Sequence, residues 1–231
     1  MFDRIAADLQ HYARYCYHEK PLWKILPRLL LAHPAVVGII WYRFGRVAWT
    51  CRVPGMRHAL QILYILGLPC ARIYSGVQIH LEADIAPGLA ILHSGGVVIA
   101  PGTKIGPESL LHHNVNLVMY RDARGPDIGA RFYAGTGVIV IDNVTIEDDV
   151  SAGAGSIITK SIPSNVVVAG APARFVRFRM PNEHPSENKT LPKRLVKKWI
   201  TTNTKNAAYS VSLSQENCSP MLRATDGHQD G

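Results

Sequence analysis

Apolar residues recur every six positions through the middle of the chain, with two interruptions. The positions are Ile73, Ile79, Ile85, Ile91, Ile99, Ile105, Leu111, Leu117, Ile128, Ala134, Val140, Ile146, Ala152 and Ile158. A β-strand alternates every two residues and an α-helix repeats every 3.6, so neither element explains this spacing. Short strands joined by tight corners, with each coil stacked on the one before, do explain it. We therefore predict a mainly β fold, a parallel β-helix over residues 73–180.

Two insertions break the six-residue period. Two extra residues fall between Ile91 and Ile99, in a Leu-His-Ser-Gly-Gly segment, and five fall between Leu117 and Ile128. Because a solenoid expels insertions to its surface, such segments can shape a site without disturbing the core. We expect the function of the chain to lie at these breaks.

Residues 1–72 predict an α-helical region. One amphipathic helix is indicated by apolar residues at helical spacing, which are Val37, Ile40, Trp41, Phe44, Val47 and Ala48. Pro34 suits the first turn of this helix, and Pro54 with Gly55 ends it. A second apolar stretch, 59–68, is expected to end at Pro69. We expect both apolar faces to pack in a core.

Residues 181–231 predict a polar C-terminal tail. The segment is rich in Pro, Asn, Ser, Thr and Lys, which are residues typical of chains that bury too little apolar surface to fold. One basic stretch, 191–200, could form a helix, and we expect disorder over roughly the last thirty residues.

Composition narrows the class of protein. Of the 231 residues, 47% are apolar, which is enough for a substantial core. The four cysteines have no spacing typical of metal ligands or of a paired motif, so we expect reduced thiols and a cytoplasmic location. The first ten residues contain two aspartates and predict no signal peptide. No segment has the roughly 18 uncharged apolar residues of a membrane span.

The formal net charge of +8 is spread over the N-terminal third and the tail. No nucleic-acid-binding motif accompanies it, so we expect no nucleic acid partner. A phosphate-bearing ligand, together with solvated lysines, accounts for the charge equally well. The basic, apolar N-terminal third allows contact with an anionic membrane surface that is at most peripheral.

Two stretches carry a resemblance to a known family. The segment GVQIHLEADIAPGLAILHSGGVVI (76–99) precedes further hexapeptides, and VVVAGAPARFV (166–176) closes them. The chain resembles the serine acetyltransferases over roughly residues 20–180, and equally the related exopolysaccharide and colanic-acid O-acetyltransferases. The resemblance implies a left-handed β-helix, although crossovers between parallel strands are usually right-handed. It also implies acetyl-CoA as the acyl donor and a homotrimer or a dimer of trimers.

In that family, the histidine matching His93 is the general base, which removes the proton from the acceptor hydroxyl. The chemistry agrees, because an ordinary imidazole titrates at about pH 6.5 and accepts protons at neutral pH. Counting repeats places His113, with His112 beside it, next to His93 on the following coil. There it could orient the base or contact the acceptor. Glu82 and Asp84 are other candidates for orienting His93.

The same resemblance implies a binding site for coenzyme A on the later coils. Family members hold the pantetheine arm against small residues, which match Gly135, Thr136, Gly153 and Ala154. Lys160 and Arg174 provide positive charge for the phosphates at the nucleotide end. We expect no metal ion.

Two departures from the family pattern leave the acceptor open. Serine acetyltransferases usually carry Asp where this chain has Leu92, and a second His before a Pro in the extended loop, where this chain reads Arg124-Gly125-Pro126. Our leading hypothesis is transfer to serine, and the alternative is transfer to a small-molecule or sugar hydroxyl in exopolysaccharide or colanic-acid synthesis. Two further alternatives use the same solenoid. One is a non-catalytic scaffold, and the other is a γ-carbonic-anhydrase-like zinc enzyme with ligands among His80, His93, His112 and His113.

Overall fold

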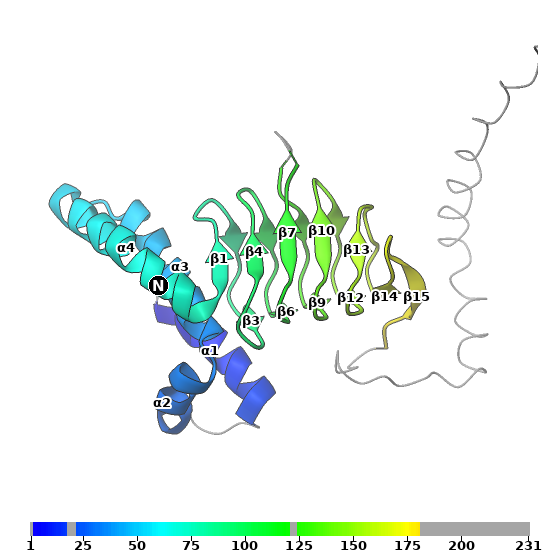
Figure 1. The fold of residues 1–231 in the computed structure, drawn as a ribbon, viewed down its shortest axis with the longest axis horizontal. Helices are drawn as coiled ribbons and strands as arrows, with labels where there is room; N and C mark the ends of the chain where they lie inside the picture. The colour runs from blue at the N-terminus through cyan, green and yellow to red at the C-terminus, as the bar shows by residue number, and fades with distance from the viewer. Residues whose placement is uncertain (1, 18–21, 121–123, 181–231) are drawn as a thin grey trace, which may run out of the picture. The chain divides into compact units, whose positions relative to one another are not determined.

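The computed structural model describes residues 2–17, 22–120 and 124–180, so the predicted tail and its helix lie outside the described residues. The described chain begins with helices and continues as a solenoid of short strands (Figure 1). The helices are α1 (Phe2–Tyr17), α2 (Leu22–Ala32), α3 (Ala35–Thr50) and α4 (Pro54–Ser75).

The strands form three sheets, one on each side of the solenoid. The first sheet has the order β1 (Val77–Ile79), β4 (Val97–Ile99), β7 (Asn116–Val118), β10 (Ile139–Ile141) and β13 (Ile157–Ile158). The second has β11 (Thr145–Ile146), β8 (Asp127–Ile128), β5 (Lys104–Ile105) and β2 (Asp84–Ile85). The third has β15 (Arg174–Phe178), β14 (Val166–Ala169), β12 (Ser151–Ala152), β9 (Tyr133–Ala134), β6 (Leu110–Leu111) and β3 (Ala90–Ile91).

Each of the strands β1 to β10 pairs in parallel with the strand three places later, β12 pairs in parallel with β14, and β15 folds back antiparallel to β14. The chain therefore winds through the three sheets in turn, and the predicted left-handed parallel β-helix is confirmed. Thirteen of the fourteen six-residue positions are buried inside it, from Ile79 to Ile158. Ile73 is the exception: it lies in α4 and its side chain is 86% exposed. The repeat begins only after Gly76, whose φ of 65° ends the helix.

Two expectations about the second helix were wrong. Helix α4 continues through Pro69 to Ser75, because residues on both sides of the proline, Tyr64 and Ala71, are buried on its inner face. This packing outweighs the backbone hydrogen bond that a proline removes. Gly67 allows the close approach, since a Cβ there would lie 2.3 Å from Cζ2 of Trp41 in α3. The outer face of α4 is exposed rather than packed in a core.

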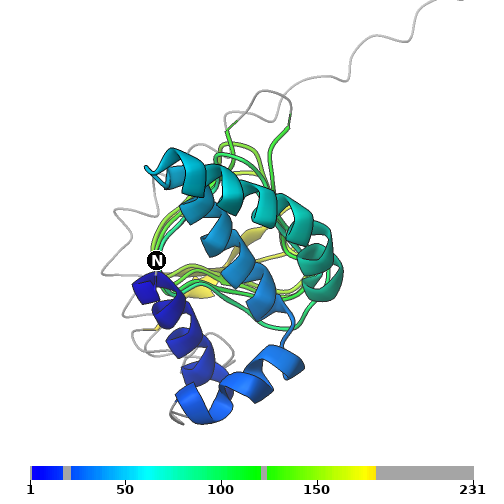
Figure 2. The same cartoon turned by 90° about the vertical axis from the view of Figure 1, so that its left-hand side faces the viewer.

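Helix α3 closes the open end of the solenoid, as the view toward that end shows (Figure 2). It begins after Pro34 and ends before Pro54, as predicted. Ala35, Ile39 and Tyr42 belong to the same buried core as the strands, and the Tyr42 hydroxyl donates a hydrogen bond to the carbonyl of Ala83, 2.6 Å away. No single described helix is long and apolar enough to span a membrane, and the one pair of segments that together passes this test, Lys24–Ala32 with Ala35–Thr50, is bent by 100°.

A buried ion pair joins two helices to the first coil. Arg43 of α3 donates through Nε and Nη2 to the carboxylate of Asp8 in α1, at 2.9 and 3.1 Å. Arg43 also donates to the carbonyls of Ile85 and Ala86, at 2.6 and 2.8 Å. One oxygen of Asp8 accepts the backbone N–H groups of Gly88 and Leu89, at 2.7 and 2.9 Å. The side chains of Asp8 and Arg43 are only 5% and 3% exposed, so both charges depend on these partners.

Neutralising Asp8 tests this arrangement. We expect Asp8→Asn to lower the free energy of unfolding by about 3–5 kcal/mol, because it leaves the charge of Arg43 buried without a counter-charge. Denaturant unfolding measures the change. The matched control is Asp3→Asn, an exposed position in the first turn of the same helix, where we expect a loss below about 1 kcal/mol. Equal losses in the two variants would contradict a structural role for the pair.

Candidate active site

The first insertion forms the corner between β3 and β4. His93 lies in it with a φ of 64°, in the left-handed region, and its side chain is exposed. Gly95 and Gly96 follow with φ values of 120° and 67°. Gly96 must lack a side chain, because a Cβ there would lie 2.2 Å from Oδ1 of Asn114 on the next coil. The insertion therefore projects an accessible imidazole while its glycines keep the corner stacked.

The strand register aligns His93 with the predicted site residues of later coils. Ile91 pairs with Leu111, Leu111 with Ala134, and Ala134 with Ala152. The residues two places further on therefore form one column along this corner of the solenoid, which is His93, His113, Thr136 and Ala154. The ring centroids of His93 and His113 are 5.8 Å apart, so the predicted proximity of the two histidines is present.

His112 lies beside His93 and His113, and Tyr133 contacts His112. The ring of His112 is 6.1 Å from that of His93, and its Nε2 is 3.1 Å from the hydroxyl oxygen of Tyr133. Burial lowers the pKa of His112, and positive charge on His93 and His113 lowers it further. Nδ1 of His113 is buried and has no hydrogen-bond partner among the described residues, so no contact there fixes its tautomer.

The helices contribute groups that the repeat pattern did not indicate. The hydroxyl of Tyr12 in α1 donates to the carbonyl of Ile91, 2.8 Å away, and its ring contacts that of His33 at 5.2 Å. Burial lowers the pKa of His33, and the charge of His93 lowers it further, which places His33 within electrostatic reach of the candidate base. Counting repeats could have found Tyr133, since it pairs with Leu110. No periodic signal connects Tyr12 or His33 with residue 93, because only tertiary packing brings them there.

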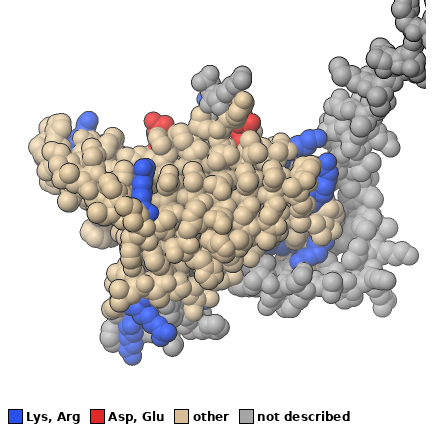
Figure 3. Space-filling view, viewed as in Figure 1, with Lys and Arg blue, Asp and Glu red and all other residues tan. Residues whose placement is uncertain are grey.

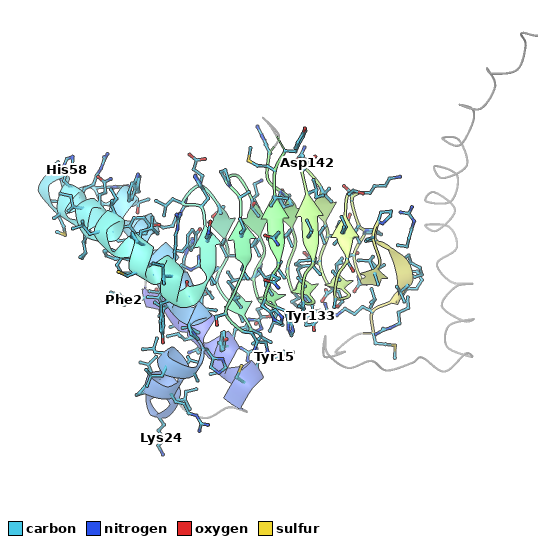
Figure 4. All side chains as sticks on the ribbon, viewed as in Figure 1. Phe2, Tyr15, Lys24, His58, Tyr133 and Asp142 are labelled. Carbon is cyan, nitrogen blue, oxygen red and sulfur yellow. The ribbon has the colours of Figure 1, made fainter. Side chains whose placement is uncertain are left out.

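The residue before His93 belongs to an apolar contact between helices and solenoid. Leu92 is 5% exposed and packs in a cluster with Tyr12, Leu29 and Leu110. Figure 4 shows the same side of the molecule and labels Tyr15 of α1 and Tyr133 of β9, which both pack against this cluster. An aspartate at position 92 would be buried here among apolar side chains, which is unfavourable without a partner. The departure from the family pattern at Leu92 thus has a packing explanation.

The predicted donor-binding residues divide into two groups. Thr136 and Ala154 lie in the column, and Gly135 and Gly153 stand one place before them on the same coils. Arg174 is near the end of the column because it pairs with Ala169, which stacks on Gly153. Gly135 serves the stacking itself, since a Cβ there would lie 2.7 Å from the amide nitrogen of Ala154. Lys160 lies apart from this group, in the exposed corner that follows β13.

The structure does not bring the other candidates to His93. Glu82 and Asp84 lie before and in β2, at a different corner and sheet, and the ring of His80 is beside Glu82, 4.0 Å from its carboxylate. Within residues 2–17, 22–120 and 124–180, no group of three or more His, Cys, Asp or Glu side chains could hold a metal ion. The zinc alternative therefore lacks a ligand set among these residues.

Comparisons with known proteins point in one direction. None of the protein-family models compared with the chain matches it. The chain is 29% identical over 172 residues to a serine acetyltransferase of Helicobacter pylori, covering 73% of this chain and 96% of that protein. The predicted resemblance is confirmed.

Two solved structures share the fold. A Brucella abortus serine acetyltransferase in complex with coenzyme A superposes with a TM-score of 0.65 at 20% identity, covering 78% of this chain and 68% of that one. A Neisseria gonorrhoeae serine acetyltransferase in complex with serine superposes with a TM-score of 0.63 at 22% identity, covering 75% and 68%.

Two half-buried histidines predict how stability depends on pH. His33 and His112 have pKa values below the ordinary 6.5, chiefly through burial, so below that pH the unfolded chain binds more protons than the folded one. The free energy of unfolding should therefore fall as the pH drops from about 7 to about 5. Urea unfolding at a series of pH values measures this slope.

Two variants separate the effect of His112 titration from the effect of its hydrogen bond with Tyr133. His112→Gln should make the slope shallower, because glutamine can still accept the Tyr133 hydrogen bond but does not titrate. Tyr133→Phe removes the hydrogen bond and should lower stability while the slope stays. A wild-type protein whose stability is constant between pH 7 and pH 5 would contradict the prediction.

Proposed function

We propose that this chain is an acetyl-CoA-dependent O-acetyltransferase that transfers the acetyl group to the hydroxyl of serine, with His93 as general base. The observation that carries the proposal is the column of His93, His113, Thr136 and Ala154 along one corner of a left-handed β-helix. Serine is the acceptor because the three relatives described above are named for serine, and none of them for a sugar.

The reaction needs a base at the acceptor and a leaving group on the donor. A ring nitrogen of His93 takes the hydroxyl proton as the oxygen attacks the thioester carbonyl carbon. The carbon–sulfur bond then breaks, and the thiolate of coenzyme A leaves and takes the proton from His93. The products are O-acetylserine and free coenzyme A, and the imidazole is restored. The exposed side chain of His93 is open to both substrates.

The neighbouring histidines suit a general base that is transiently protonated. The pKa values of His33 and His112 are lowered, mainly by burial, so both rings are neutral at pH 7. The imidazolium formed on His93 therefore meets neutral, polarisable rings rather than fixed cations. His113 lies edge-on to His93, with ring planes at 81°, and is the group that we assign to orienting it.

Acetyl-CoA, the acyl donor, fits along the column toward the last coils. Thr136 is half-buried and Ala154 is exposed, so a long thin arm can lie against this corner without displacing a large side chain. Arg174 is exposed near the end of the column and offers charge to a phosphate. We also propose assembly as a homotrimer or a dimer of trimers, which light scattering of the purified chain tests.

A substitution at Ala154 tests where acetyl-CoA binds. Ala154→Trp should raise KM for acetyl-CoA by about tenfold or more, because the indole occupies the surface along which the arm lies. Asn143→Trp is the control, since residue 143 is exposed at another corner of the solenoid. Steady-state kinetics with acetyl-CoA as the varied substrate measures both variants. An unchanged KM in Ala154→Trp would place the donor elsewhere.

His93 tests the catalytic role. We expect serine-dependent release of free thiol from acetyl-CoA, and a decrease of kcat by about 10²–10⁴ in His93→Ala. His58→Ala is the matched control, because His58 is an exposed histidine near the beginning of α4, far along the helix from the solenoid (Figure 4). Its kcat should equal that of the wild type.

The same assay separates the competing functions. Binding of coenzyme A without serine-dependent release would move the acceptor to a sugar hydroxyl. Stoichiometric zinc that disappears in both His93→Ala and His113→Ala would favour the zinc enzyme. Neither release nor binding of coenzyme A would favour the scaffold.

A further inference from the structure

A cavity lies where α3, α4 and the corner after β1 meet, at a different corner of the solenoid from His93. Its volume is about 390 Å³, which falls within the range of about 300–1,000 Å³ typical of small-molecule sites. The lining side chains include Arg46 and Trp49 from α3, Tyr64, Leu68 and Arg72 from α4, and Leu81 from the corner. The three from α4 share one face, because residues four apart are neighbours on a helix.

Two aromatic rings form one wall of this cavity. The indole of Trp49 meets the ring of Tyr64 edge-on, with centroids 5.5 Å apart and ring planes at 79°. Tyr64 is only 4% exposed, and Gly45 of α3 makes room for it, since a Cβ there would lie 2.5 Å from Cε2 of the ring. Trp49 is 43% exposed, so part of its indole remains accessible. The wall therefore suits a flat apolar group, which aromatic rings bind by offset stacking or edge-on contact.

The polar groups of the cavity are hydrogen-bond donors. Neither the hydroxyl of Tyr64 nor the guanidinium of Arg72 has a hydrogen bond or ion pair with any residue of 2–17, 22–120 or 124–180. Burial raises the pKa of Tyr64 and the charge of Arg72 lowers it, so the two groups lie within electrostatic reach of each other. Arg46 is oriented by the carbonyl of Leu81, to which its Nη1 donates at 2.9 Å, and its other N–H groups remain donors.

Carboxylates are scarce around these donors. No Asp or Glu occurs from residue 21 to residue 81, so neither α3 nor α4 offers a counter-charge to Arg46 or Arg72. On the face shown in Figure 3, α4 accordingly carries blue and tan atoms but no red ones. Among the described residues that line the cavity, the one carboxylate is that of Glu82, which is 75% exposed and lies 4.0 Å from the ring of His80. Two guanidinium groups beside an aromatic wall therefore favour a ligand that is both flat and negatively charged.

We propose that this cavity binds a small aromatic anion, a flat apolar ring that carries a carboxylate or a phosphate. The ring packs against Trp49 and Leu68, and the acidic group accepts hydrogen bonds from Arg46 and Arg72. The hydroxyl of Tyr64 donates a further hydrogen bond to the same group. This site goes beyond the proposed acetyl transfer, because it uses none of the residues in the His93 column.

Isothermal titration calorimetry of the full chain tests the proposal. The probes are phenyl phosphate and benzoate, and each combines a ring with one of the two acidic groups. We expect saturable binding of at least one of them, and the tighter of the two identifies the acidic group. Benzyl alcohol lacks the charge and inorganic phosphate lacks the ring, so both should bind about tenfold or more weakly than the tighter probe.

Three variants connect the binding to this cavity. Arg72→Gln should raise the Kd of the tighter probe about tenfold or more, because a charge-assisted hydrogen bond is lost. Tyr64→Phe should raise it about threefold, because the ring stays and only the hydroxyl is removed. Arg28→Gln is the matched control, since it removes the same charge from an exposed arginine of α2 outside the cavity, and its Kd should equal that of the wild type. Circular dichroism of each variant verifies the fold.

Four outcomes would overturn the proposal. The first is a wild-type chain that binds neither phenyl phosphate nor benzoate at millimolar concentration. The second is an equal Kd in the wild type and in Arg72→Gln, which would place the probe elsewhere on the molecule. The third is binding of benzyl alcohol or inorganic phosphate as tight as that of the aromatic anions. The fourth is a loss of oligomer mass by light scattering in Arg72→Gln without any probe binding by the wild type, which would assign the cavity to a contact between copies.

Discussion

The buried pair of Asp8 and Arg43 determines how the helices sit on the solenoid. A β-helix ends in a coil whose inner side chains and backbone groups need a cover, and here α3 provides it. The cover is oriented by directional contacts: Arg43 donates to two carbonyls of the first coil, and Asp8 accepts two of its N–H groups. Because each charge is nearly inaccessible to water, the pair tolerates only one arrangement of α1, α3 and the corner at residues 85–89.

That arrangement also builds one side of the candidate active site. With α1 fixed by Asp8, Tyr12 reaches the carbonyl of Ile91, and its ring contacts His33. On the solenoid side, Leu92 packs in the same apolar cluster as Tyr12. His93 is therefore placed between a rigid stack of coils and a rigid helical cover, although it lies in an exposed insertion. The helical region packs against the candidate active site, and on its outer surface it carries the separate apolar face of α4.

Stacking explains why the site is a column rather than a pocket. Backbone hydrogen bonds between successive coils fix the register, so residues one full coil apart in sequence, such as Ala134 and Ala152, become neighbours at about 4.8 Å spacing. A small residue at Thr136 or Ala154 leaves a continuous surface, and an insertion at one coil projects the imidazole of His93 over that surface. The imidazoles of His112 and His113 gather there because the second coil carries two adjacent histidines at the same corner.

Much of the solenoid could be predicted from the sequence, since its interactions are periodic. The six-residue spacing determined the β-helix, the inward residues from Ile79 to Ile158 and the proximity of His93 to His113, because each depends only on counting positions between corners. The spacing misplaced its first member, Ile73, since one apolar residue at the right interval is indistinguishable from an exposed helical position.

The rest was decided by tertiary structure. The partners of Asp8 and Arg43, the approach of Tyr12 and His33 to the site and the burial of Leu92 join segments up to about eighty residues apart, and no periodicity connects them. Whether an apolar helical face is buried or exposed is likewise not a property of its own residues. Ile62 and Leu66 have the composition of a core, and only the position of α3 on the opposite side of α4 leaves them at the surface, because a helix packed on one face keeps the other face free.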